Sequence, residues 1–453
     1  MADTAINRVL FPQNVSIDDL SIKTTNGQIF NVKRLLVDFS YFEDIYSFSI
    51  SGYVTLRDAT GIIENLGLTG KETIIIDFDI ITGGRRKPQE FRLYSIPSRK
   101  PIGPMNSEFI KLYFCSEELL LSEQTKVTKS YSDTVSNIIT NILTTKLKIT
   151  KPYDIQSTVG TYNFNVPTLK PFEAISWLSL YARPSNNNLI GADMFFYETR
   201  NGYNFKSLST LYNQPVYRTY KYQQQNLSPE KQPLDEDAIT VLDFEFIKAF
   251  NALEDINSGT FANRLISLDV LTRNAKITDF DYNNYAGDKL NSGTILNDVQ
   301  NRFGKTPNQM YTGKLKLVTS NSEQKKKENI DSNGVAQDIF IETTVPNRTA
   351  QIALSNYTVI KLRIPIDPYL TAGSIIYFDL PSISGGKDKL PDRYYSGRYL
   401  VTAVRHVMKS EGGNQTILEI TKDSAPTAAS VPTSITNDTG NTLFWGKNGK
   451  FFR

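Results

Sequence analysis

The sequence contains one histidine and one cysteine, and these two residues limit the nucleophilic chemistry that the chain could carry out. A Ser-His or Cys-His pair, or a zinc site built on histidine, would have to use His406. His406 lies in the segment YLVTAVRHVMK and Cys115 lies in FIKLYFC, and both segments have the composition of strands. We therefore predict that both are structural strand residues and that the fold needs no disulfide bond.

Carboxylates are the other side chains that could do chemistry, because a glycosidase needs only two of them about 5 to 10 Å apart. Asp77 and Asp79 share one face of a predicted strand, and Asp235, Glu236 and Asp237 form a cluster. Such groups are typical of the solvent face of a sheet and of turns. The segment GLTGKE at residues 67–72 resembles a phosphate-binding loop, but it is too short for the Gly-x4-Gly-Lys-Ser/Thr motif and lacks its hydroxyl residue. The sequence thus predicts no catalytic, cofactor-binding or metal-binding residues and indicates that the protein is not an enzyme.

The overall composition is that of a globular protein with two to four domains. The chain has 453 residues, 40% of them hydrophobic, and a net charge of only +3, which is too small to indicate specific binding of nucleic acid. The lysine triplet at residues 325–327 lies in a charged segment, residues 320–334, which we predict to be a mobile loop. Neither a signal peptide nor a run of about 18 apolar residues occurs, so we expect no membrane insertion.

The segment 41–80 shows the clearest strand pattern. Apolar residues alternate with polar ones along its first half at Tyr46, Phe48, Ile50, Val54 and Leu56. Turn residues follow at 58–61, and Gly70 precedes a second alternating run that contains Ile74, Ile76, Phe78 and Ile80. This pattern predicts two strands of an antiparallel sheet or small barrel, each with one buried face.

The pattern changes to a helical one after residue 123. Apolar residues recur at helical spacing behind Ser132, a predicted N-cap, at Val135, Ile138, Ile139, Ile142 and Leu143. A second helix is predicted from Pro171 to Pro184. Residues 192–208 then predict a hairpin in which Asn201 and Gly202 form a type I′ turn between two aromatic strands.

Strand patterns return in the last third of the chain. LTAGSIIYFDL from Leu370 is similar to LTGKETIIIDF from Leu68, which indicates an internal duplication. The predicted fold is therefore α+β and mostly β, with two similar small antiparallel β-barrels, a mixed helix and hairpin middle domain, and a flexible C-terminal arm. The predicted units are the first barrel at 1–122, the middle domain at 123–215, a connecting domain at 216–345, the second barrel at 346–423, and the linker with its arm at 424–453.

The C-terminal arm combines a linker with a cluster of aromatic residues. Residues 424–442 are mostly small and polar and contain proline, which is typical of a linker. The segment LFWGKNGKFFR follows, and its large apolar side chains make sense if they dock on a surface. We predict as interface residues Phe444, Trp445, Phe451 and Phe452. The docking surface could belong to the same subunit, to a sister subunit or to a different partner.

Three segments in order resemble one family. The first segment matches it at Glu43, Asp44, Gly52, Asp58, Gly61, Gly70 and Glu72. The second runs from Phe195 to Leu211 and includes FFYETRNGYNF, and the third, residues 259–282, is GTFANRLISLDVLTRNAKITDFDY. Together they resemble the baseplate central hub protein of contractile-tailed bacteriophages, which is related to the base of type VI secretion spikes. The resemblance covers most of residues 1–423.

The resemblance implies a structural protein of the virion tail baseplate, assembled in the host cytoplasm. Two similar barrels per subunit would give a homotrimer with six barrels, matching a six-fold tail tube. The implied partners are a spike protein, the tail tube or its initiator, and the tape-measure protein, which would pass through the ring with the DNA. Two alternatives stay open: another tail or wedge component of the same particle, and a β-rich carbohydrate-active enzyme or carbohydrate-binding adhesin.

Overall fold

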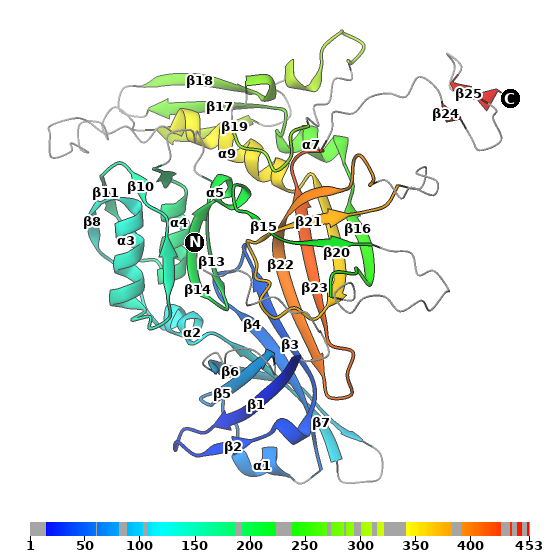
Figure 1. Cartoon of the computed structure of the whole chain (residues 1–453). Coiled ribbons are helices and arrows are strands. Elements are labelled where there is room, and N and C mark those ends of the chain that lie inside the picture. The colour runs from blue at the N-terminus through cyan, green and yellow to red at the C-terminus, as the bar shows by residue number, and fades with distance from the viewer. Residues whose placement is uncertain are drawn as a thin grey trace.

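The computed structural model places most of the chain in β-sheets (Figure 1). The residues that it describes are 15–59, 61–80, 88–102, 107–185, 193–222, 238–269, 273–284, 287–293, 300–309, 315–320, 341–382 and 391–426, together with the backbone of three short strands at 435–436, 442–445 and 451–452. Several predicted features lie outside this part: the acidic cluster at 235–237, the side chain of Asp79 and the lysine triplet at 325–327.

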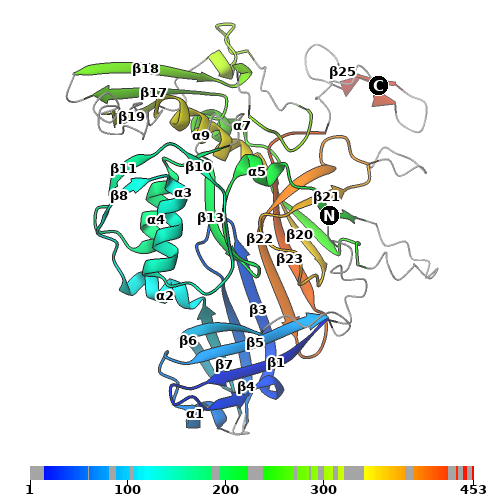
Figure 2. The ribbon, with the colours of Figure 1, turned by 60° about the vertical axis from the view of Figure 1, so that its left-hand side comes forward.

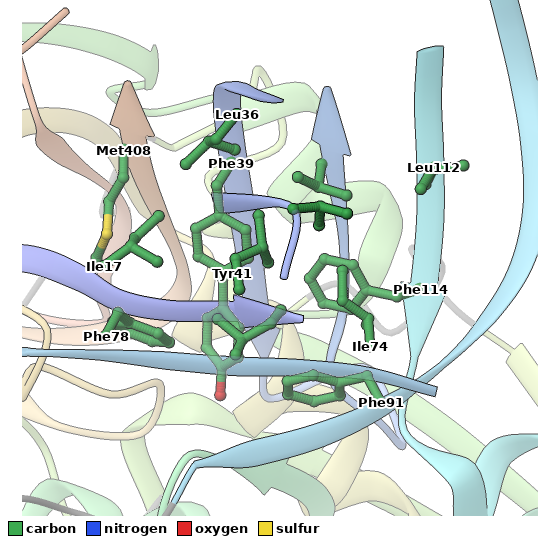
Figure 3. Packing of buried hydrophobic residues seen from close by; sticks show 14 of the residues in the cluster. Ile17, Leu36, Phe39, Tyr41, Ile74, Phe78, Phe91, Leu112, Phe114 and Met408 are labelled. Atoms are coloured by element: carbon green, nitrogen blue, oxygen red, sulfur yellow. The ribbon is translucent and has the colours of Figure 1, made fainter. Parts of the chain in front are cut away.

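The first half of a large sheet is formed by the N-terminal strands, all antiparallel, in the order β3-β4-β7-β6-β5-β1-β2. Their bounds are β1 Val15–Lys23, β2 Ile29–Asn31, β3 Leu36–Asp44, β4 Ser51–Asp58, β5 Thr73–Ile80, β6 Gln89–Ile102 and β7 Ser107–Cys115. A short helix, α1 Ile62–Leu66, follows β4. The sheet curls, so that alternate side chains of distant strands, such as Phe39, Phe78 and Phe114, pack into one core (Figure 3).

The predicted strand at 46–56 begins later than its alternation indicates. Residues 45–50 form the connection between β3 and β4, and β4 begins at Ser51. The cause is a local turn, in which the Asp44 carboxylate accepts the Tyr46 backbone N–H at 2.8 Å and ends β3. Phe48 stacks on Phe172 of the middle region, with ring centroids 5.6 Å apart. The second predicted strand is confirmed as β5, with Ile74, Ile76 and Phe78 buried.

The second half of the large sheet comes mainly from the last third of the chain. Its strands are β15 Val216–Lys221, β16 Asp243–Lys248, β20 Thr358–Pro365, β21 Ile375–Asp379, β22 Gly397–Lys409 and β23 Gln415–Lys422. They follow the order β16-β20-β23-β22, while β21 pairs with both β22 and β15. A separate apolar core, which includes Ile360, Phe378 and Leu418, fills this half.

Strand β22 joins the two halves into one sheet of 13 strands. Its first residues pair with β21, and its last seven, from Ala403 to Lys409, pair with residues 38–44 of β3. The predicted mostly β architecture with antiparallel sheets is confirmed. Among the described residues neither half closes into a barrel, and the β3 edge of the first half pairs with β22 of the second half.

The middle region packs three helices against a hairpin (Figure 2). The helices are α2 Glu117–Gln124, α3 Val135–Asn141 with a π-helical turn at Ile142–Lys146, and α4 Pro171–Ser179. The apolar residues predicted for the first helix are all buried, but its N-cap is Thr134 and not Ser132, which lies in strand β8 Ser130–Asp133. The second helix ends at Ser179, before the predicted end, because Arg183–Pro184 forms strand β12 and pairs with β10 Thr158–Val159.

The predicted hairpin is confirmed, but its turn is one residue earlier. Its strands are β13 Met194–Thr199 and β14 Gly202–Ser207, and Thr199 pairs with Gly202. Arg200 and Asn201 therefore form the turn, and neither has the positive φ that a type I′ turn requires. Gly202, with a φ of +118°, takes the unusual backbone conformation instead. Strand β9 Tyr153–Ile155 pairs in parallel with β14, and helix α5 Leu208–Tyr212 follows β14. Strand β11 Tyr162–Asn165 pairs with β8.

A third unit lies at the opposite end of the molecule from β1 and β2 (Figures 1 and 2). Strands β17 Ala262–Asp269, β18 Asn274–Asp281 and β19 Leu315–Ser320 form a small sheet, and helix α9 Ile341–Ser355 packs on it with α7 Ala252–Ser258 beside it. Within the described part of the chain, no helix is long and apolar enough to cross a membrane. The C-terminal arm contributes only the backbone of β24 Ile435–Thr436, β25 Thr442–Trp445 and β26 Phe451–Phe452.

Candidate functional site

The tip of the β13–β14 hairpin connects the two halves of the large sheet. The Arg200 guanidinium donates to the carbonyl oxygen of Phe78 in β5 at 2.6 Å and to that of Pro368, before β21, at 3.3 Å. Its central carbon also lies 4.1 Å from the centre of the Phe78 ring. One side chain of the middle region thus bridges the first half of the sheet and the second. We call this region, built around Glu43, Lys151, Glu198 and Arg200, the three-way joint.

Glu43 connects the same three parts of the chain through its carboxylate. The acid lies on β3 and is 2% exposed. One oxygen accepts the Arg200 backbone N–H at 2.6 Å and the Tyr41 hydroxyl at 3.1 Å, and the other accepts the Ala372 backbone N–H at 3.0 Å. Burial raises the pKa of Glu43 to about 7, although these hydrogen bonds act in the opposite direction. Arg200 belongs to the hairpin and Ala372 to the second half of the large sheet. Glu43, which belongs to the first half, therefore bonds to both.

Buried Glu198 and partly exposed Lys151 form a second cluster at the base of the hairpin tip. The Lys151 ammonium lies 2.7 Å from carboxylate oxygens of both Glu198 and Glu118. Glu198 also accepts the Ile50 backbone N–H at 2.9 Å and the Ser116 hydroxyl at 2.6 Å. Burial raises the pKa of Glu198, and Lys151 opposes this shift. Burial lowers the pKa of Lys151, but the two carboxylates outweigh it and the pKa is raised overall.

A cleft of about 690 Å³ lies over this cluster. Its lining includes Gln89 and Phe91 of β6, Glu118, Lys151 and the hairpin tip at 198–202. Lys151, Glu118 and Glu198 in the cleft bond to one another, and Glu198 also accepts a backbone N–H, so these three groups hold parts of the chain together. Among the residues that the structure describes, no group of three His, Cys, Asp or Glu side chains could hold a metal ion.

His406 and Cys115 lie in strands, as predicted. His406 is in β22, fully buried, with its Nδ1 3.0 Å from the Thr416 hydroxyl and its ring stacked on Tyr41. Burial and the nearby Arg200 lower the pKa of His406 to about 3, so the ring is neutral at physiological pH. Burial raises the pKa of the Cys115 thiol, at the end of β7, to about 11. The Cys115 thiol is therefore not in the thiolate form that acts as a nucleophile, and the pKa of His406 is too low for an effective general base at neutral pH.

The structure brings together only some of the residues that the sequence singled out. Glu43 lies in the joint, and Gly52 lies in β4 opposite Tyr41 of β3. The predicted interface residues of the arm are described by their backbone alone: Phe444 pairs with Phe452 and Trp445 with Phe451. The sequence analysis missed the roles of Lys151, Glu198 and Arg200. A signal was present for two of them, because Glu198 and Arg200 stand within an otherwise aromatic hairpin sequence.

Replacing Glu43 by glutamine should remove a pH dependence of stability. Below about pH 4.5 the carboxyl is protonated in both the folded and the unfolded chain. As the pH rises, the unfolded chain loses this proton first, because the folded pKa is about 7. The stability of the wild type relative to E43Q should therefore fall by about 3 kcal/mol between pH 4.5 and pH 7 and then stay constant. Parallel denaturation profiles of the two proteins across this range would contradict the assignment.

Comparison with known proteins connects this architecture to phage tails. The chain is 24% identical over 389 residues to the probable baseplate hub protein gp334 of Vibrio phage KVP40, which covers 83% of this chain and 87% of that protein. No family model matches the chain. The similarity to the KVP40 hub protein agrees with the resemblance seen in the sequence.

Solved structures with similar folds include phage tail proteins at low sequence identity. The tail protein from Neisseria meningitidis MC58 is 8% identical, with a TM-score of 0.48, and the prophage MuSo2 43 kDa tail protein from Shewanella oneidensis is 6% identical, with a TM-score of 0.49. Each of these two matches covers 91% of this chain and 99% of the chain that it is compared with. The E. coli c3393 protein, a component of the type VI secretion system, is 7% identical over 93% of this chain and 81% of its own, with a TM-score of 0.41.

Proposed function

We propose that this chain is the structural hub of a contractile phage tail baseplate. The observation that carries the proposal is the similarity to the KVP40 hub protein over 83% of the chain. The three-way joint supports a mechanical role, because Arg200 ties Phe78 and Pro368 to the hairpin, and Glu43 ties Ala372 to the same hairpin through the Arg200 backbone N–H. Hydrogen bonds of this kind hold parts of a chain in one relative orientation, which a hub under load requires.

The finer proposal is a homotrimer that forms a pseudo-six-fold ring. The ring would join the tail tube, or its initiator protein, to the central spike, and would let the tape-measure protein and DNA pass. It would be part of the virion and would assemble in the host cytoplasm. The outer face of β6 and β7 supports subunit contacts, because Tyr94, Ile96 and Phe109 are exposed there and Tyr94 stacks on Tyr113. Exposed aromatic clusters of this kind are typical of protein interfaces.

Light scattering tests the trimer. The purified chain should have a mass of about three times 51.1 kDa, and a chain that ends at Asn437 should likewise have three times its own, smaller subunit mass. The double variant Y94E/I96E should be a folded monomer, because two charges would enter the apolar contact. The control F303E changes an exposed phenylalanine elsewhere and should stay trimeric. A stable wild-type monomer that binds glycans would contradict the hub proposal and favour the carbohydrate-binding alternative.

The proposed tail partners are tested separately. The trimer should co-purify with the spike protein and with the tube or tube-initiator protein of the same particle. Binding to sheath or peripheral wedge proteins in their place would favour the alternative of another tail component.

A further inference from the structure

The two halves of the large sheet repeat one arrangement of strands. The first half contains the order β3-β4-β7-β6-β5 and the second half the order β16-β20-β23-β22-β21. These strands also correspond in their order along the chain, and all neighbours within both sets are antiparallel. The similar segments that begin at Leu68 and Leu370 lead into β5 and β21, which correspond to each other. The two halves are therefore structural repeats.

A shared irregularity fixes which residues correspond. The register of β6 on β7 shifts between Leu93 and Ser95, and the register of β22 on β23 shifts between Val401 and Ala403. Such shifts mark β-bulges, which insert an extra residue at a defined position of a ladder. Both bulges occur just beyond the residues that pair with β5 or β21. Leu93 therefore corresponds to Val401.

The same count relates β3 to β16. Ladder partners across the sheet lead from Leu93 to Tyr41 of β3, and from Val401 to Phe246 of β16. Tyr41 lies in the first apolar core, and Phe246 packs against the second. Aromatic residues thus occupy matching positions on the two strands.

The contact that joins the halves uses one strand of each kind. Residues 403–409 of β22 pair with residues 38–44 of β3. Since β22 corresponds to β6 and β3 corresponds to β16, the equivalent contact would pair β6 with β16. Within one chain these two strands do not pair, and Figure 1 shows them on opposite sides of β3 and β22. The equivalent contact therefore requires a second copy of the chain.

Both strands have a side that is open to such a partner. Beyond Gln89–Arg92, which pairs with β5, strand β6 is paired in the described residues only on the side of β7. The ladder of β16 with β20 likewise leaves its other side unpaired in this part of the chain. The bridge from Thr240 to Lys221 lies before β16. A hydrogen bond from Val32 to Leu20 precedes β3 in the same way, and β3 still pairs with β22.

The burial of the strands also indicates a missing contact. Residues 403–409 of β22 and residues 38–44 of β3 each include four buried side chains. In contrast, no residue is buried at 95–102 of β6 or in β16. Ile96 and Ile247 are 45% and 55% exposed. The strands that lack a partner are thus the ones with exposed apolar side chains.

The register of the first contact predicts that of the second. Arg99 of β6 corresponds to His406 of β22, which pairs with Tyr41. Arg99 would therefore pair with Phe246, and the next residue, Lys100, with Glu245. Residues 97 and 101 of β6 are prolines, which occur in sheets on edge strands and can only accept hydrogen bonds. The predicted contact is accordingly short and centred on Arg99.

We propose that β16 of one copy of this chain pairs with residues 98–102 of β6 in the next copy, in the position that β3 occupies beside β22. Because the two surfaces differ, the contact repeats from head to tail and closes into a ring. The assignment rests on the proposed hub function, which sets the number of copies at three. Contacts within chains and contacts between chains would then alternate around the ring.

Disulfide cross-linking tests the pairing. Lys100 and Glu245 are exposed and would lie opposite each other, so cysteines at these positions would be close enough to bond. Under mild oxidation K100C/E245C should shift from one chain to covalent species of two and three chains, and reduction should reverse the shift. The control K100C/K276C, whose second site is exposed on β18, should stay at one chain. The native Cys115 is 1% exposed and does not compete.

Single variants distinguish a bond between copies from a bond within one chain. When K100C chains and E245C chains are produced together, a two-chain species with one of each should form, and neither variant alone should give it. Light scattering of the same samples gives the number of subunits. A trimer without this bond would overturn the proposed contact but not the hub function. A monomer would contradict both the trimer and the contact.

Discussion

Replacing Glu198 by alanine should lower the free energy of unfolding by about 3–5 kcal/mol, because it removes one partner of a buried ionic cluster. Glu198 is 1% exposed and binds Lys151, the Ile50 N–H and the Ser116 hydroxyl. The variant leaves the Lys151 ammonium with Glu118 and removes the acceptor of a buried backbone N–H. Chemical denaturation followed by circular dichroism measures the loss.

The neighbouring Glu117 provides a matched control. It pairs with Arg92 at 2.7 Å, but the two side chains are 53% and 34% exposed. Glu117→Ala should therefore cost less than about 1 kcal/mol, since solvent screens such a pair. Equal losses for the two variants would show that burial does not set the strength of the Glu198 cluster. The joint would then be no stronger than any surface contact.

Replacing Gly52 by alanine should destabilise the first half of the sheet by about 3 kcal/mol or more. A Cβ atom at this position would lie 2.2 Å from the Phe114 ring and 2.4 Å from the carbonyl oxygen of Ser40. The ring is fully buried, and the carbonyl belongs to the paired strand β3, so neither can move away without disturbing the core. The expected result is a lower denaturation midpoint with little change in its pH dependence.

Ser51→Ala is the control for this variant. Ser51 is the preceding residue of β4 and is half-buried, so its change to alanine should alter the free energy of unfolding by about 0.5 kcal/mol. If Gly52→Ala had an effect as small as Ser51→Ala, the close packing of β4 against β3 and Phe114 would be wrong. Gly52 was singled out in the sequence by a resemblance, and the packing supplies a physical reason for it.

Local patterns in the sequence were enough to predict several elements. The spacing of Val135, Ile138 and Ile139 predicted α3, because a helix with one buried face repeats every 3.6 residues. The alternation of Ile74, Ile76 and Phe78 predicted β5 for the corresponding reason in a strand. The counts of one histidine and one cysteine limited the catalytic possibilities before any contact was known. Such features depend only on which residues are neighbours in sequence.

Local patterns predicted the ends of strands less well, because these depend on bonds from side chains to the nearby backbone and on strand register. The alternation at 46–56 runs through a turn that the Asp44 carboxylate closes. The Asn-Gly pair at 201–202 predicted a turn one residue away from the observed one, because the pairing of Thr199 with Gly202 sets the strand register. Register depends on contacts of the whole hairpin with its surroundings, and two residues do not determine it.

By itself, the sequence determined that the protein is mostly β, where its main helices and hairpin lie, and that it is similar to phage baseplate hub proteins. Only the tertiary structure showed that β22 fuses the two halves into one sheet and that Glu43, Arg200 and Ala372 meet at one joint. The physical reason is separation along the chain. Glu43 and Ala372 are 329 positions apart, and their contact depends on how several strands pair and curl, which no local periodicity encodes.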